Sequence, residues 1–165
     1  MPEKQTVERA KKAKRKGKSA STQSGEFVRE EMHHIREGKH GARSTKQAIA
    51  IGLSKARRAG VALPPPKKGT VSEKTRRSAE RAYSMGRRGK PKPSRRRSQA
   101  RERVLKRESR GAAARKELAR QARSAARRRT RAARSASARR AVRTKGRRGR
   151  SAAARKAART RARRR

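Results

Sequence analysis

The amino-acid sequence predicts a mostly disordered chain with a small all-α module, a helical hairpin, and conditional helices in a long basic tail. Three observations lead to this prediction. The 165 residues include 57 Lys or Arg but only 11 Asp or Glu, so the net charge is +46. Most of the hydrophobic residues are Ala, which buries little area, so most of the chain cannot offset the entropy cost of its own ordering. The larger apolar residues gather in residues 24–63.

The first segment, residues 1–23, is predicted to be a basic disordered tail that closes in a Ser/Thr/Gln-rich linker. It lacks the apolar stretch of a secretory signal. No apolar run in the sequence reaches the ~18 residues of a transmembrane helix. We therefore expect a cytoplasmic protein that has no membrane partner.

Residues 24–66 are the predicted helical module. Ser24 is the expected N-cap of its first helix, because Glu residues follow it near the positive end of the helix dipole. Spacings of three and four residues place the apolar side chains on one face. These are Phe27, Val28, Met32 and Ile35. Gly38 or Gly41 is expected to end this helix.

The second helix of the module has stronger signals. Ser44 and Gln47 fit a capping box, in which each side chain bonds the backbone of the other residue. An apolar stripe follows, made of Ile49, Leu53 and Ala56, and Gly60 provides a stop. Gly52 lies inside this helix, where glycine costs ~1 kcal/mol relative to Ala. It is either a point of close approach, to the first helix or to a DNA backbone, or a tolerated glycine.

Beyond the module, Pro64–Pro66 stops any helix, and residues 67–86 are a predicted linker with a possible short helix. Thr70–Glu73 offers a second capping box, so this helix is expected to run to Met85 and end at Gly86. It has few apolar residues to bury.

Residues 87–165 form a low-complexity, Arg/Ala-rich basic tail, with 35 Lys or Arg against three Glu. A short repeat is visible, since Ala112–Lys116 recurs as Ala152–Lys156. Ala and Arg favour helix, whereas like charges three and four residues apart oppose it. We therefore expect a tail that is disordered when free and helical once phosphates neutralise it.

A net charge of +46 calls for a polyanionic partner. Duplex DNA suits it, with one negative charge per ~1.7 Å of helix axis. Readers of single strands and of RNA stack bases on aromatic side chains, and this chain has one Tyr and one Phe. RNA stays the alternative partner. The predicted nucleic-acid-binding residues are Lys46, Lys55, Arg57, Arg58, Arg95, Arg96, Arg97, Arg127, Arg128, Arg129, Arg139, Arg140, Arg147, Arg148, Arg163, Arg164 and Arg165.

Catalytic and metal-binding patterns are not predicted. The sequence has no Cys and no Asp, and it lacks a phosphate-binding Gly-rich loop. His33, His34 and His40 lie near Glu residues, but two adjacent histidines face different sides of a helix, and no pair has the spacing of a helical zinc site. We expect surface histidines, no metal, no cofactor, no small-molecule substrate and no enzymatic activity.

Two blocks of the module resemble a known family: Met32–Lys39, and the run from Ser44 to Gly60. They are similar to short basic bacterial proteins catalogued as a domain of unknown function, whose members are sometimes labelled DNA-binding. The resemblance covers residues ~24–66 and implies a bacterial origin and a small helical module. The tail from Arg87 resembles histone-like tails in composition, although it uses Arg where linker histones use Lys and Pro.

Together these features predict a histone-like, nucleoid-associated protein that binds and compacts DNA by neutralising phosphates, without reading sequence. One alternative is an RNA-binding or ribosome-associated assembly protein. Another is an adaptor in which the face around Ile49 and Leu53 binds a protein partner.

Overall fold

Helices occupy most of the chain in the computed structural model, which describes residues 2–89 and 94–163. The prediction of a mostly disordered chain is therefore wrong, as is the intrinsic disorder expected of the basic arms. Two units form, Met1–Gln121 and Ala122–Arg165. The elements are α1 (Lys4–Arg15), α2 (Ala20–Arg36), α3 (Thr45–Arg58), α4 (Glu73–Arg88), α5 (Arg95–Arg107), the 3₁₀ helix η1 (Arg110–Ala113), α6 (Arg115–Arg127) and α7 (Arg131–Ala162).

The N-terminal segment that we expected to be disordered is helix α1. Its Lys, Arg and Ala residues have high helix propensity, and packing against α2 buries Thr6 and Ala10. The cap of α2 is Ser19, whose Oγ accepts a hydrogen bond from Thr22 N at 3.3 Å. The predicted cap, Ser24, instead lies inside the helix and donates its hydroxyl to Ala20 O at 2.8 Å.

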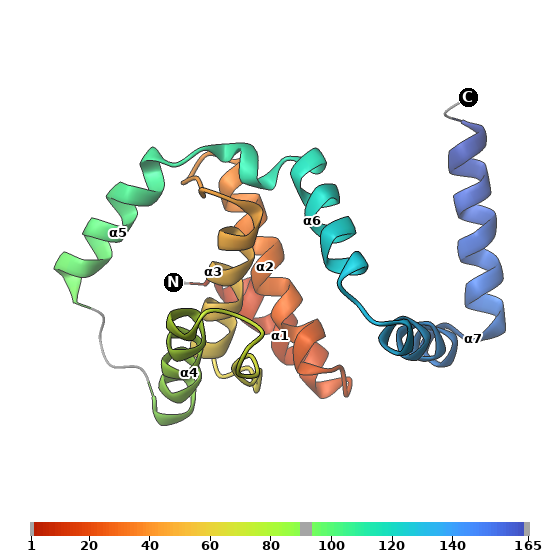
Figure 1. Ribbon diagram of the computed structural model, residues 1–165, viewed down its shortest axis with the longest axis horizontal. Coiled ribbons are helices and arrows are strands. Elements are labelled where there is room, and N and C mark those ends of the chain that lie inside the picture. The colour runs from red at the N-terminus through yellow and green to blue at the C-terminus, as the bar shows by residue number, and fades with distance from the viewer. Residues whose placement is uncertain (1, 90–93, 164–165) are drawn as a thin grey trace. The chain divides into compact units, whose positions relative to one another are not determined.

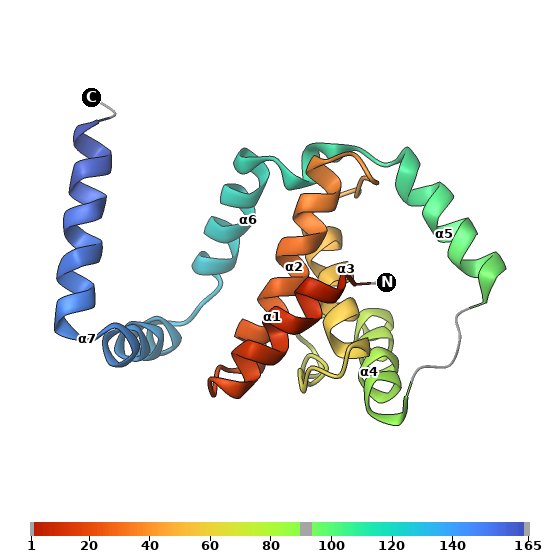
Figure 2. The same ribbon diagram turned by 180° about the vertical axis from the view of Figure 1, so that it is seen from behind.

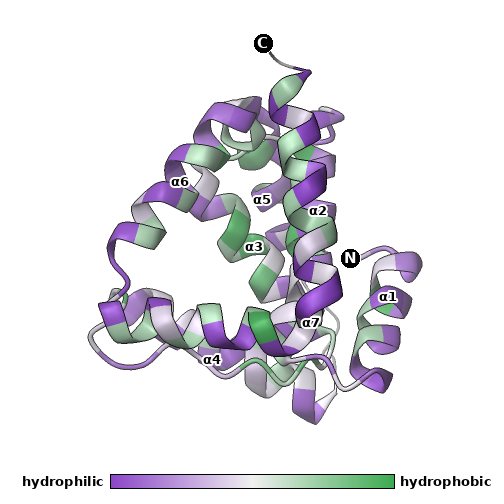
Figure 3. Cartoon of the chain, turned by 90° about the vertical axis from the view of Figure 1, so that its right-hand side faces the viewer, coloured by the Kyte–Doolittle hydropathy of each residue, from purple (hydrophilic) through white to green (hydrophobic). Residues whose placement is uncertain are grey.

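The first unit is built around α2 and α3. Figures 1 and 2 show α2 between α1 and α3, and α4 against α3, in agreement with the contacts between these helices. Two clusters of buried apolar side chains result. One contains Met32, Ile35, Ala42, Ala48, Ala112 and Ala113, and the other Ala10, Phe27, Ala56 and Val61. In Figure 3, hydrophobic residues are prominent in α3 and also occur in other helices.

The contact between α2 and α3 depends on small residues. The buried positions of α3 include Ala48, Gly52 and Ala56, at intervals of four residues, whereas Ile49 and Leu53 of the predicted stripe are half-buried. A Cβ added at Gly52 would lie 2.7 Å from Val28 Cα. Gly52 is therefore a point of close approach between the two helices, as one of the two interpretations of this residue predicted.

The predicted cap of α3 at Ser44 is confirmed, whereas the return bond expected from Gln47 to Ser44 goes to Arg43 instead. Ser44 Oγ accepts from Gln47 N at 3.2 Å, and Gln47 Oε1 reaches back to Arg43 N at 2.9 Å, one residue before the cap itself. Gly60 follows the C-cap with a φ of 88°, a conformation that favours glycine. Helix α4 is capped by Ser72 but passes the predicted stop at Gly86, where a Cβ would collide with the carbonyl oxygen of Arg57.

Part of the expected tail belongs to the core of the first unit. In η1, Ala112 and Ala113 are buried against α2 and α3. Thr45 Oγ1 donates to Ala112 O at 2.7 Å, and Arg36 Nε donates to Ala113 O at 3.1 Å. Residues 109–118 are therefore held by specific contacts, which their basic composition did not indicate.

In the second unit, α7 is capped by Thr130, whose Oγ1 accepts from Ala133 N at 3.2 Å. At Gly146 the backbone leaves helical geometry, with φ 60° and ψ −178°, which produces a kink. The Ala side chains spread around α7 rather than forming one apolar face. The helical preference of Ala and Arg thus outweighs like-charge repulsion without a bound polyanion. No helix in the described ranges combines the length and apolar content that a membrane span requires.

Candidate nucleic-acid interface

The second unit has a high density of positive charge and no acidic side chain of its own to neutralise it. Residues 122–165 contain 20 Lys or Arg and no Asp or Glu. Described arginines throughout this unit are exposed to solvent, including those on both sides of the kink in α7. An exposed guanidinium can offer hydrogen-bond donors to an external acceptor, and its planar fork matches a phosphate group.

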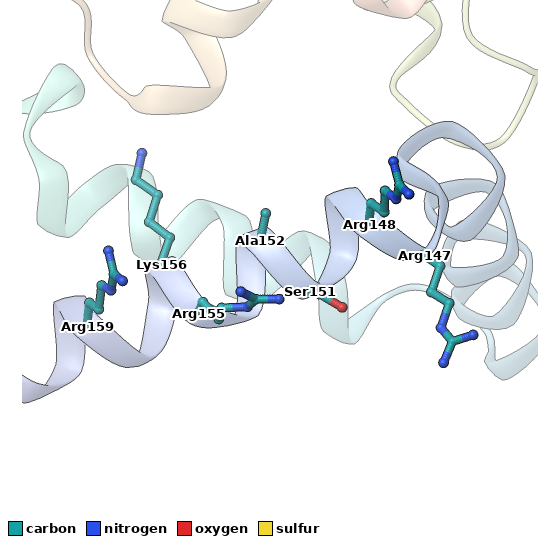
Figure 4. A pocket seen from close by; sticks show the side chains of 7 residues that line it. All are labelled: Arg147, Arg148, Ser151, Ala152, Arg155, Lys156 and Arg159. Carbon is teal, nitrogen blue, oxygen red and sulfur yellow. The ribbon is translucent and has the colours of Figure 1, made fainter.

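One face of α7 beyond the kink carries a basic depression. Its lining residues are Arg147, Arg148, Ser151, Ala152, Arg155, Lys156 and Arg159. Figure 4 shows Arg148, Ala152 and Lys156 on the same side of the helix, as their four-residue spacing requires. The short side chains of Ser151 and Ala152 leave the depression open between five longer cationic ones. We call these seven residues the α7 basic face.

Only part of this face was predicted from the sequence. Arg147 and Arg148 were predicted, whereas Arg155, Lys156 and Arg159 were missed. A signal for two of the three existed, because Arg155 and Lys156 close the second copy of the Ala112–Lys116 repeat. Helical periodicity from Arg147 places Arg155 and Lys156 on the same face, but this signal requires a helix, and the composition predicts disorder there in the free protein.

The other predicted residues of the C-terminal region lie in or next to α5, α6 and α7, outside the α7 basic face. All those described are exposed: Arg127 ends α6, Arg128 and Arg129 precede α7, Arg139 and Arg140 lie in its first half, and Arg163 follows it. Arg164 and Arg165 lie outside the described residues. Arg95, Arg96 and Arg97 form the first turn of α5, where their charges oppose the positive end of the helix dipole. A bound phosphate would relieve that repulsion.

The four predicted cations of α3 divide into two pairs. Lys46 and Arg58 are exposed, and Arg58 donates to Ser54 Oγ at 2.9 Å. The other two, Lys55 and Arg57, are engaged inside the fold. Lys55 Nζ lies 2.6 Å from Glu31 Oε2.

Arg57 holds the segment that follows α3. Its guanidinium donates to Leu63 O at 3.1 Å and to Pro64 O at 3.2 Å, and burial lowers the pKa of Arg57 from its ordinary value. We therefore correct the prediction that Lys55 and Arg57 contact nucleic acid. Helical spacing placed them beside the apolar stripe but could not show that the partner helix and the following loop would cover them.

Aromatic side chains do not form a base-stacking surface in the described part of the chain. Phe27 is 1% exposed and belongs to the core. Tyr83 is half-buried on α4, with the guanidinium carbon of Arg87 5.9 Å from its ring centre. The exposed cations therefore offer contacts to phosphates rather than to unpaired bases.

A family of unknown function, DUF6496, matches residues 3–68, which include α1, α2 and α3. The match starts well before residue ~24, where the expected resemblance began. It covers less than half of the chain and does not extend to α7. The family's description assigns no function, composition or source. No curated protein and no solved structure matches this chain.

Proposed function

We propose that this protein binds double-stranded DNA through the phosphates, without reading sequence, and compacts it in the bacterial nucleoid. The observation that carries the proposal is the second unit, in which 20 Lys or Arg residues are accompanied by no acidic residue. Binding at such a surface releases counterions condensed on the nucleic acid, which drives association at low salt.

A helical second unit supports contact with a duplex. An α-helix fits the major groove of B-DNA, which is about 12 Å wide. The α7 basic face spans residues 147–159, about 18 Å of helix at 1.5 Å per residue. Arg side chains on several sides of α7 would then reach phosphates on both walls of the groove.

Absence of sequence readout follows from the residue types. Asn and Gln, which pair with adenine edges, do not occur in residues 122–165, and neither do Asp and Glu, which accept from cytosine. Arg can contact guanine, but the same side chain binds any phosphate. The shortage of exposed aromatic side chains favours a duplex over single-stranded RNA.

The test is the salt dependence of binding to duplexes of unrelated sequence, measured by fluorescence anisotropy between about 50 and 200 mM salt. If about ten phosphates are neutralised, log K falls against log salt with a slope near −9, alike for each duplex. A slope shallower than about −3, or a strong preference for one duplex, contradicts the proposal. Tighter binding to structured RNA than to DNA in direct competition would assign the protein to RNA instead.

Matched charge variants locate the interface. Replacing the five cations of the α7 basic face by Gln removes five charges from the second unit. The control replaces five exposed lysines of the first unit by Gln: Lys11, Lys12, Lys14, Lys16 and Lys18. We expect the α7 variant to flatten the salt slope by about 4, and the control to change it by less than half as much. Equal effects would mean that net charge alone determines affinity.

A further inference from the structure

Three side chains with metal-ligating chemistry converge in the first unit, far in sequence from the α7 basic face. One carboxylate oxygen of Glu31 and one ring nitrogen each of His34 and His40 all lie within 4.8 Å of one another. Glu31 and His34 are three residues apart on α2, hence on one face. The chain then turns at Gly38, with φ 78°, and brings His40 back to them.

Two of the three histidines are not the surface groups expected from the sequence. The side chains of His34 and His40 are 13% and 15% exposed, and their rings meet edge to face with centres 6.1 Å apart. His33 is exposed and takes no part in the cluster. The remaining exposure of the two rings leaves a path from solvent to the cluster.

Glu31 is fully buried, and among the described residues neither of its carboxylate oxygens has a hydrogen-bond donor. Lys55 Nζ approaches Oε2 to 2.6 Å as an ion pair, without the angular geometry of a hydrogen bond. The same ammonium lies 3.5 Å from Oε1 of Glu30, which is also buried. Two buried carboxylates thus share one ammonium group, and a further cation would balance the charge.

The contacts of His40 orient its ring toward Glu31. Nδ1 lies 3.0 Å from the carbonyl oxygen of Gly41, which can only accept a hydrogen bond, so Nδ1 carries the hydrogen. Nε2 of the neutral ring then has a lone pair, and it lies 3.3 Å from Glu31 Oε1. Two acceptors at that distance repel each other unless a proton or a metal ion lies between them.

His34 is oriented in a similar way by a carboxylate. Its Nε2 lies 2.9 Å from Glu3 Oε1, and this hydrogen bond, with the nearby charge of Lys39, lowers the pKa of Glu3. Because the Glu3 carboxylate accepts this hydrogen bond, Nε2 of His34 carries the hydrogen, and Nδ1 of the neutral ring has the lone pair. Hydrogen bonds of this kind, to a carboxylate or to a backbone carbonyl, fix the tautomer of metal-binding histidines.

We propose that Glu31, His34 and His40 bind a divalent transition-metal ion of the zinc class. Two imidazoles and one carboxylate suit such an ion, whereas Ca²⁺ and Mg²⁺ prefer sites made of oxygen alone. Ligand bonds of about 2.0–2.2 Å require ligand atoms roughly 3.4 Å apart in a tetrahedral site. Side-chain rotations on binding would bring the three atoms to that separation. The site is independent of the proposed nucleic-acid binding.

Zn²⁺ added to the metal-free full-length protein tests this proposal without any substitution. The chain has three histidines, so their ring signals are few enough to follow by NMR. We expect the His34 and His40 rings to shift until Zn²⁺ is equimolar with protein, and the His33 ring to stay unchanged. If all three rings respond alike, or none does, the proposal is wrong. If no ring responds, a proton on His40 Nε2, shared with Glu31, takes the place of the metal ion.

Variants provide the second measurement, with Zn²⁺ affinity read by competition with a chromophoric chelator. His40→Ala should lose at least tenfold in affinity, and Glu3→Gln about tenfold through the lost orientation of His34. His33→Ala is the matched control and should bind as the wild type does. Loss in the control equal to that in His40→Ala, or full affinity in His40→Ala, would overturn the proposal. If a variant does not fold by circular dichroism, the ring shifts of the wild type decide.

Discussion

The two units have similar net charges but differ in how their cations are neutralised. Residues 1–121 contain 37 Lys or Arg together with all 11 acidic residues, a net charge of +26. Several of these acids pair with cations across helices, as Lys55 does with Glu31. Residues 122–165 have a net charge of +20 in 44 residues, with no acid and no buried side chain among those described.

This difference separates two uses of basic residues. In the first unit, cations such as Lys55 and Arg57 hold the fold together, because buried carboxylates and carbonyls are their partners. In the second unit the cations have no carboxylate partner of their own unit, so a polyanion is their natural counterpart. A high content of Lys and Arg therefore does not by itself identify the binding residues. The groups that each cation contacts within the fold distinguish a structural cation from a binding one.

Deleting residues 122–165 should produce the largest effect. It removes 20 of 46 net charges, so affinity for duplex DNA should fall by several orders of magnitude at moderate salt. Thermal unfolding of residues 1–121 should be unchanged, because every buried residue in the described ranges lies at or before Ala113. Anisotropy and circular dichroism measure the two quantities. Retention of most of the affinity would assign binding to the first unit.

Gly52→Ala should destabilise the first unit by about 1–3 kcal/mol, because the new Cβ would overlap Val28 on α2. Gly25→Ala is the matched control, since Gly25 also lies inside a helix but a Cβ there meets no atom within 4 Å. The control should stabilise the protein by about 0.5–1 kcal/mol. Chemical denaturation measures both. Equal destabilisation by the two substitutions would contradict the close packing of α2 on α3.

Thr45→Val tests whether η1 belongs to the first unit. The substitution keeps the side-chain shape but removes the hydroxyl that donates to Ala112 O, at a cost of about 1–2 kcal/mol. Hydrogen exchange should also show faster opening of residues 109–114. Unchanged stability and exchange would mean that this segment is part of a loosely attached tail.

Gly146→Ala should have the smallest effect on binding. Alanine is strained at φ 60° and ψ −178°, so the substitution favours a continuous α7 and should raise helicity in circular dichroism. Its charge is unchanged, so DNA affinity should stay within about a factor of two if phosphate contacts dominate. A large loss of affinity would show that the kink itself positions the α7 basic face.

The amino-acid sequence by itself determined the local features of this protein. The Ser44 cap, the stop at Gly60 and the burial of Phe27, Met32 and Ile35 follow from propensities and periodicity within a few turns of helix. The charge excess of the C-terminal region is also a property of composition. We extended that composition to disorder, and this step failed because Ala and Arg are strong helix formers even among like charges.

Only the tertiary structure decided which residues act together. Ala112 and Ala113 look like any part of the basic tail, and they become core because α2 and α3 leave space for small side chains and donors for their carbonyls. Likewise, Lys55 meets Glu31 across two helices, and His40 meets His34 after a turn. Such contacts depend on distances through space between residues that local patterns cannot connect.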